Sequence, residues 1–280
     1  MTEKLIHVAH GGHSGDITYS LPFAEYVSKH YGGKIIFHII SDRPVHFPEG
    51  MEHPNGNSTI MTKNAYEFIS PLLKNLPYVE DVVFTKMSEL NEGTIKLDYY
   101  RDTKGFNLGA GNIQTWARKW LGLDIKTEEP WIHLSDLKRT PKLICGFTQR
   151  YRNTAINYNF IDDLDSGFIG LKEEYEHFKE KNNLKKIPYI AINNALEMAR
   201  IIGSANLYLG NQSFAFSIAE GLKVNRALEV CEICPNVIPS GKGAHDYLTQ
   251  EALLNILIKN KINPKRLQSE SRGSFTHYFK

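Results

Sequence analysis

A glycine-rich turn near the start of the chain holds a carboxylate that could act as a base. The stretch His10-Gly11-Gly12-His13-Ser14-Gly15-Asp16 follows an apolar run and precedes an amphipathic segment. A strand-to-helix turn of this kind brings the backbone close to a ligand and points helix N–H groups at negative charge. Asp16 could take a proton from an acceptor hydroxyl, or it could cap the helix. No Gly-Lys-Ser/Thr and no G-x-G-x-x-G follows, which disfavours a P-loop ATPase and an NAD enzyme.

Histidines and cysteines do not form a convincing metal site in the sequence. His7, His10 and His13 are spaced by threes, and neighbours at this spacing on a strand point to opposite faces. Cys231 and Cys234 form a Cys-x-x-Cys pair, but no second ligand pair stands at the spacing that a structural zinc site requires. We therefore expect no metal, and we interpret His13 as part of a polar lining.

Two arginines follow the first strand that we expect in the second half of the chain. Arg150 and Arg152 lie in the stretch 149–153, just after the apolar run 142–147. Guanidinium groups at the carboxyl end of a strand are suited to binding a diphosphate. The alternative is a solvated loop.

The elements that would position these groups alternate between strands and helices. Apolar or β-branched runs predict strands, and amphipathic stretches predict helices. The expected strands are 5–9, 34–41, 79–85, 142–147, 165–170, 187–192, 207–210 and 226–230. The expected helices are 17–30, 65–76, 171–182, 195–202, 214–222 and 246–259. The alternation predicts an α/β fold in two halves, with a ligand between them at the carboxyl ends of the strands.

The composition is that of an ordinary globular chain of 280 residues. Lys and Arg number 33 against 31 Asp and Glu, a net charge of +2, so any anionic partner must meet a local patch. No run reaches the roughly 18–20 apolar residues of a membrane span, and no signal peptide is recognisable. Three cysteines suit a reducing compartment. We expect a soluble, cytoplasmic protein, with its oligomeric state open.

The opening turn also resembles a known family. Gly15-Asp16-Ile17, followed by Leu21-Pro22, is similar to the Gly-Asp-Val…Leu-Pro opening of the heptosyltransferase-like (family 9) GT-B glycosyltransferases. In those enzymes the aspartate is the proposed catalytic base. The resemblance implies Asp16 as the catalytic residue and a GT-B-like fold, in which two Rossmann-like domains face each other across a cleft.

The second half carries a further resemblance. The stretches 202–213 and 219–222 are similar to the family's nucleotide-sugar segment, where a polar turn holds the donor pyrophosphate at a helix N-terminus. The implied donor-binding residues are Gly15, Arg150, Arg152, Asn211, Gln212, Ser213, Phe214 and Glu220. The chain departs from the family in having Asn211-Gln212-Ser213 where Asp-Ser/Thr-Gly is common, and Phe216 where a histidine follows. These departures indicate a divergent branch.

Several side chains keep two interpretations. Glu220 could accept hydrogen bonds from ribose hydroxyls, or pair with Lys223. The loop 240–245 could close over the donor or form a plain turn. Trp116 and Trp120 are spaced to pack on one helix face in the core, although aromatic and basic residues also suit sugar stacking or nucleic-acid contact.

The resemblance assigns the acceptor to the N-terminal half of the chain. The acceptor-side residues would be His13, Asp98 and Arg101. We predict an acceptor-side Rossmann-like domain at 1–138 and a nucleotide-sugar-binding Rossmann-like domain at 139–280, with a C-terminal tail that crosses back.

The predicted activity is inverting, metal-independent transfer of a hexosyl, pentosyl or heptosyl group. The donor would be a nucleotide diphosphate sugar, with a UDP-sugar expected and no further cofactor. The acceptor would be a saccharide such as a surface glycan, or a hydroxymethylated base in phage DNA. The alternatives are a non-catalytic binding protein on a GT-B scaffold and a UDP-sugar epimerase.

Overall fold

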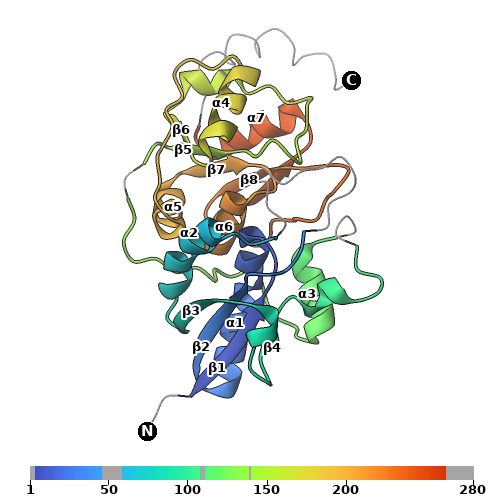
Figure 1. The fold of residues 1–280 in the computed structure, drawn as a ribbon. Coiled ribbons are helices and arrows are strands. Elements are labelled where there is room, and N and C mark those ends of the chain that lie inside the picture. Colours follow the sequence, from blue (N-terminus) through green and yellow to red (C-terminus); the bar gives the residue numbers. More distant parts are fainter. Residues whose placement is uncertain (1–3, 46–58, 108–110, 139, 263–280) are drawn as a thin grey trace.

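A computed structural model describes residues 4–45, 59–107, 111–138 and 140–262. Within these ranges the chain forms two parallel sheets, one in each half (Figure 1). The first sheet has the order β3-β2-β1-β4, and its neighbouring strands all run parallel. Its strands are β1 (Leu5–His10), β2 (Lys34–Ile40), β3 (Val79–Thr85) and β4 (Ile95–Lys96).

Helices connect the strands of the first sheet, and local signals in the sequence set their ends. α1 ends at Gly32, whose φ of 65° is left-handed and suits a glycine. α2 begins after Thr62, whose side chain accepts a hydrogen bond from Ala65 N. The helices are α1 (Ser14–Tyr31), α2 (Lys63–Lys74) and α3 (Ile113–Leu121), with 3₁₀ turns η1 (Met87–Glu89) and η2 (Tyr99–Asp102).

The second sheet has the order β6-β5-β7-β8-β9, and it is also parallel throughout. Its strands are β5 (Leu143–Gly146), β6 (Ser166–Phe168), β7 (Leu207–Gly210), β8 (Arg226–Glu229) and β9 (Ala244–Tyr247). The helices of this half are α4 (Lys172–Lys181), α5 (Ala195–Ser204), α6 (Phe214–Leu222) and α7 (Gln250–Lys259), with the 3₁₀ turn η3 (Asn159–Asp163).

A continuous apolar core joins the two halves. Ile17 and Leu21 of α1 belong to the same buried cluster as Ile202 of α5 and Phe216 and Ile218 of α6. Helix α1 packs against α6, and α2 packs against α5. Because burial of apolar surface is the main stabilising force in folding, this core favours one arrangement of the two sheets.

The connecting segment adds a polar link through Trp131. Its indole is buried, and Nε1 donates a hydrogen bond to Thr18 O of α1 at 3.1 Å. Its backbone N donates to Gly221 O of α6 at 3.0 Å. One residue thus contacts both helices where the halves meet.

The structure confirms the predicted α/β fold and corrects two elements. The stretch 187–192 makes one isolated bridge, between Tyr189 and Phe168, because Pro188 lacks the N–H that a strand ladder needs. The predicted helix 246–259 begins only at Gln250, since Ala244–Tyr247 form edge strand β9. The predicted domain boundary falls at Arg139 and the predicted crossing tail at 263–280, and both lie outside the described residues.

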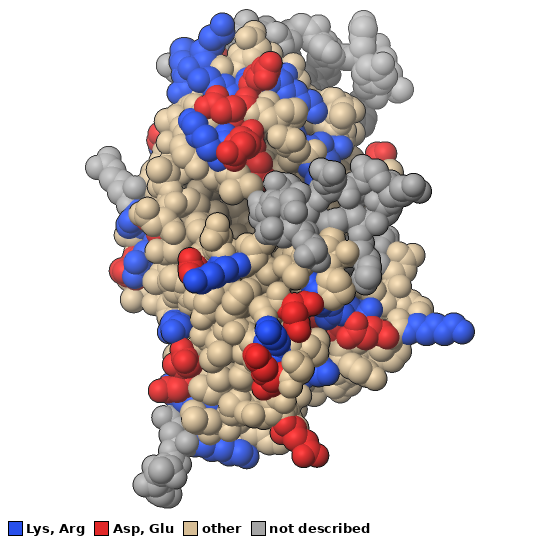
Figure 2. Space-filling view, viewed as in Figure 1, with Lys and Arg blue, Asp and Glu red and all other residues tan. Residues whose placement is uncertain are grey.

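The described residues on the face shown in Figure 2 carry no single dominant charge. On the face shown in Figure 2, Lys and Arg lie interspersed with Asp and Glu over both halves. Any anionic ligand on this face must therefore be recognised by a few specific cations.

None of the described helices is long and apolar enough to cross a membrane.

Candidate active site

The turn between β1 and α1 depends on two glycines. A Cβ atom on Gly12 would lie 2.7 Å from His10 Cε1 and 2.9 Å from Asp16 Oδ2. A Cβ atom on Gly11 would lie 2.9 Å from Arg43 Cδ. The glycines therefore let these side chains close over the backbone at the carboxyl edge of the first sheet.

Asp16 lies in the first turn of α1 and contacts a backbone N–H and a guanidinium group. Its Oδ2 accepts a hydrogen bond from His13 N at 3.0 Å and lies 2.7 Å from Arg101 Nη2. The side chains of Asp16 and Arg101 are only 18% and 13% exposed. The N-cap residue itself is His13, so Asp16 caps the helix from the third helical position and also forms a largely buried ion pair.

The surroundings of Asp16 favour its ionised form. Burial alone would raise the pKa of the Asp16 carboxyl, but Arg101, the two histidines and the His13 N–H outweigh it and hold this pKa below its ordinary value. Burial lowers the pKa of His10. Burial also lowers the pKa of His13, opposed by Asp16 and reinforced by Arg150 of the second half. Arg150 is therefore close enough to act electrostatically on this turn.

Asp98 supports the turn from inside the protein. The side chain is buried, and its Oδ2 accepts hydrogen bonds from Gly11 N at 2.9 Å and Arg43 Nη1 at 2.6 Å. Arg43 also pairs with Asp102. Of the predicted acceptor-side residues, Arg101 and His13 thus lie beside Asp16, whereas Asp98 holds the backbone beneath them.

The N-terminus of α6 lies against the N-terminus of α1. A Cβ atom on Gly15 would lie 3.7 Å from Phe214 Cα and 3.8 Å from Ser217 Oγ, which is ordinary van der Waals distance. Ser213 caps α6 by accepting a hydrogen bond from Phe216 N at 3.2 Å. Two positive helix ends therefore meet where the halves join, an arrangement that attracts anions. We call this region the domain junction, defined by Gly15, Asp16, Ser213 and Phe214.

The amides of Asn211 and Gln212 are engaged within the protein. Asn211 is fully buried and bonds to the loop 148–151. Gln212 Nε2 donates to Cys234 O at 2.8 Å and to Asn236, while Gln212 Oε1 has no hydrogen-bond partner among the described residues. The Asn211 amide is thus already used by the loop rather than turned to a ligand.

The two predicted arginines have different surroundings. Arg152 Nε lies 2.8 Å from Oε1 of buried Glu229, and its guanidinium lies over the Phe147 ring at 4.6 Å. Arg150 is exposed, with its guanidinium 5.5 Å from the centroid of the Tyr151 ring. Arg150 is therefore accessible to a diphosphate, and Arg152 is held inside the second half.

Glu220 belongs to a buried ionic network. Its carboxylate pairs with Lys223 and Arg226 and accepts a hydrogen bond from Ser240 N at 3.1 Å. Of the two interpretations of Glu220, the structure has the pair with Lys223. The same cations fix the loop that follows: Lys223 Nζ donates to Ser240 O at 3.0 Å and Arg226 Nη1 to Lys242 O at 2.9 Å.

The remaining side chains discussed in the sequence analysis are two cysteines and two tryptophans. Cys231 and Cys234 are free thiols, and no three His, Cys, Asp or Glu in the described part of the chain are grouped to hold a metal ion. Trp116 packs against Phe106 with ring centroids 5.4 Å apart, but Trp120 is 36% exposed. Of the two interpretations of the tryptophans, packing on the core fits Trp116, which is partly buried against it, and does not fit Trp120.

Sequence reasoning missed two residues of this region. Arg43 lies just beyond the carboxyl end of β2, and a survey of every strand end would have included it. Tyr151 follows Arg150 and is partly buried; burial raises the pKa of its hydroxyl, and Asp16 adds to that rise. Tyr151 also has a left-handed φ of 56°. The sequence does not indicate this left-handed conformation, since glycine or asparagine is the usual residue with a positive φ.

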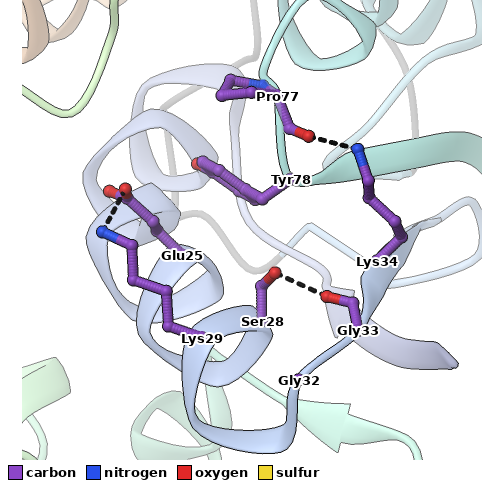
Figure 3. A pocket seen from close by; sticks show the side chains of 8 residues that line it. All are labelled: Glu25, Ser28, Lys29, Gly32, Gly33, Lys34, Pro77 and Tyr78. Atoms are coloured by element: carbon purple, nitrogen blue, oxygen red, sulfur yellow. Dashed lines mark hydrogen bonds and ion pairs between the residues drawn. The ribbon is translucent and has the colours of Figure 1, made fainter. Parts of the chain in front are cut away.

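A separate pocket of about 290 Å³ lies at the opposite edge of the first sheet (Figure 3). Its polar groups pair with one another: Lys34 Nζ donates to Pro77 O at 2.5 Å, and Lys29 pairs with Glu25 at 2.7 Å. It lies beside the C-terminal end of α1, away from Asp16. We therefore assign the candidate site to the domain junction.

Comparisons with known proteins support the fold. No family model matches the sequence, and no curated protein matches it. Among solved structures, E. coli heptosyltransferase WaaC with ADP-2-deoxy-2-fluoro heptose is 10% identical with a TM-score of 0.56, covering 92% of this chain and 100% of that one. A family 9 glycosyl transferase from Veillonella parvula DSM 2008 is 12% identical with a TM-score of 0.57, covering 94% and 91%. E. coli ADP-heptose lps heptosyltransferase II is 12% identical with a TM-score of 0.57, covering 95% and 100%. The chain has the GT-B fold of these heptosyltransferase structures, and that fold fits a divergent family 9 member.

Proposed function

We propose that this chain is a GT-B-type glycosyltransferase that moves a sugar from a nucleotide diphosphate sugar to an acceptor hydroxyl. The observation that carries the proposal is the domain junction. An ionised Asp16 from the first half lies beside a helix N-terminus from the second half, within electrostatic reach of Arg150. The fold shared with heptosyltransferases supports the same reaction class.

The proposed step begins with Asp16 as general base. Its carboxylate takes the proton of the acceptor hydroxyl while that oxygen bonds to the anomeric carbon of the donor. The bond from this carbon to the diphosphate oxygen breaks, and the diphosphate leaves with the electron pair. Attack from the face opposite the leaving group inverts the anomeric centre. Arg150 and the α6 N-terminus would stabilise the charge that develops on the diphosphate.

The proposed donor contacts are the backbone around Gly15, Ser213 and Phe214, together with the side chain of Arg150. Arg152 and Glu220 are not among these donor contacts, because both side chains already form buried ion pairs within the protein. A UDP-sugar remains our expected donor. Because the WaaC structure contains ADP-2-deoxy-2-fluoro heptose, ADP-sugars should be tested as donors as well. We propose that the reaction needs no metal ion, which predicts unchanged turnover after treatment with a chelator.

For the acceptor we propose a saccharide. Tyr99 lies two residues before Arg101 and is 56% exposed, which suits stacking against a sugar ring. DNA is less well matched, because the described Lys and Arg side chains on the face seen in Figure 2 lie among Asp and Glu and form no continuous positive path there for phosphates.

The test compares wild type with Asp16→Asn. This variant keeps the size of the side chain and removes the base, so transfer should fall by about 100-fold or more while donor affinity stays within about twofold. Asp81→Asn is the matched control, because the Asp81 side chain is half exposed and pairs with Lys74, neither of which belongs to the candidate site, and it should not lower transfer. Full turnover by Asp16→Asn would overturn the base assignment. A wild type that binds no nucleotide sugar would favour the non-catalytic alternative, and conversion of the donor sugar without an acceptor would favour an epimerase.

A further inference from the structure

The Asn211 side chain holds the loop that carries Arg150. Asn211 follows β7 directly and is fully buried. Its Oδ1 accepts a hydrogen bond from Thr148 N at 2.9 Å. Its Nδ2 donates to Arg150 O at 2.6 Å, to Thr148 O at 3.2 Å and to Tyr151 O at 3.3 Å. One side chain therefore bonds to the backbone of three residues in the loop after β5, namely Thr148, Arg150 and Tyr151.

These contacts require an amide rather than a carboxylate. An amide accepts through its oxygen and donates through its nitrogen, whereas an ionised aspartate only accepts. At position 211, aspartate would keep the bond from Thr148 N but turn a negative oxygen toward the carbonyls of Arg150 and Tyr151. Leaving partly buried carbonyls without donors is costly. The asparagine in this chain, where the family resemblance implies an aspartate, therefore has a structural reason.

The far end of the loop is anchored separately by Glu229. Its Oε1 accepts a hydrogen bond from Asn153 N at 2.7 Å and pairs with Arg152. Between the two anchors Arg150 remains exposed, and Tyr151 adopts its left-handed conformation. The loop thus has a fixed backbone that presents one accessible cation beside the domain junction.

We propose that Asn211 is a positioning residue for the donor: its amide fixes the loop 148–151 so that Arg150 meets the diphosphate. This inference rests on the proposed function. It requires that Asn211 acts through Arg150, so the effects of changing the two residues must overlap rather than add.

The experiment measures the donor dissociation constant by calorimetry, using the nucleotide sugar that binds the wild type best. Asn211→Asp should weaken binding by about tenfold or more, from several lost hydrogen bonds, and Arg150→Ala should weaken it similarly. The double variant should bind within about twofold of Arg150→Ala alone. Asn225→Asp is the matched control, because that exposed amide donates to Asn206 O at 3.1 Å, away from the loop, and should leave affinity unchanged.

Hydrogen exchange supplies a readout that needs no ligand. In Asn211→Asp, exchange of the amides of 148–151 should rise, while exchange in β8 should stay as in wild type. If Asn211→Asp does not fold, Thr148→Val removes a hydroxyl that lies 3.3 Å from Asn211 Nδ2 without adding charge, and it should weaken donor binding by about threefold, again without adding to Arg150→Ala.

The outcomes separate the two proposals. Wild-type donor affinity in Asn211→Asp, additive losses in the double variant, or unchanged exchange in the loop would each overturn the role of Asn211 while leaving the glycosyltransferase proposal intact. A wild type that binds no nucleotide sugar would instead overturn the proposed function.

Discussion

Replacing Arg101 by methionine should move the acid limb of the pH–rate profile upward. Arg101 Nη2 lies 2.7 Å from Asp16 Oδ2, and both side chains are largely buried. A cation at this range typically lowers a carboxyl pKa by about 1–3 units, and each unit corresponds to about 1.4 kcal/mol. In Arg101→Met the opposing effect of burial on the pKa of Asp16 would dominate. The limb should therefore shift to higher pH by about 1–3 units.

The sign follows from the ionised form of Asp16 being the active base. Wild type holds this pKa below its ordinary value, so Asp16 loses activity only as the pH falls through that low pKa. The assay is kcat/KM for the donor against pH, which reports groups of the free enzyme. A change in acceptor affinity would scale the profile without moving its limb.

Arg118→Met is the control for this experiment. Arg118 lies in the same half and bonds to Thr127 Oγ1 at 2.7 Å, and it is not among the groups that shift the pKa of Asp16. Its variant should keep the wild-type limb. An acid limb at the same pH in Arg101→Met and wild type would refute the argument that the ion pair sets the state of the base.

Three further substitutions test the structure around the site, each by urea unfolding alongside transfer assays. Gly12→Ala puts a methyl group 2.9 Å from Asp16 Oδ2, so it should destabilise the fold by about 1–3 kcal/mol and reduce transfer; wild-type values for both would contradict the described turn. Trp131→Phe removes the hydrogen bond to Thr18 O and should cost about 1–2 kcal/mol, whereas no loss would argue against this link between the halves. Glu220→Gln leaves two buried cations without their anion and should cost about 3–5 kcal/mol; a loss below about 1 kcal/mol would contradict the buried network.

Parts of the site are readable from sequence because local order determines them. The glycine-rich turn before Asp16 and the polar turn before α6 stand at strand-to-helix transitions. Ligands bind at the carboxyl ends of parallel strands, beside helix N-termini, whatever the contacts of the individual side chains are. The strands themselves are readable as apolar runs, but two-residue β4 and edge strand β9 form through pairing with neighbours that local pattern does not reveal.

The partners of charged side chains were harder to predict. Arg152 appeared as free as Arg150, yet Glu229 lies 77 positions away in sequence and is brought to Arg152 by the packing of β8 beside β7. The ion pair of Asp16 with Arg101 likewise depends on the position of η2 after β4. Sequence indicates which residues carry charge near a strand end, and tertiary packing decides which of them stay accessible.

The most direct test of the central claim is thermal unfolding in the presence of UDP-, ADP-, GDP- and CMP-sugars. A ligand at 100 times its dissociation constant stabilises the folded state by about 2.7 kcal/mol, which should raise Tm by about 5–10 °C. We predict such a shift for at least one diphosphate sugar, its loss in Arg150→Ala, and a smaller shift for the CMP-sugar, which carries a single phosphate. No shift with any of the four would contradict the claim that the domain junction binds a nucleotide diphosphate sugar.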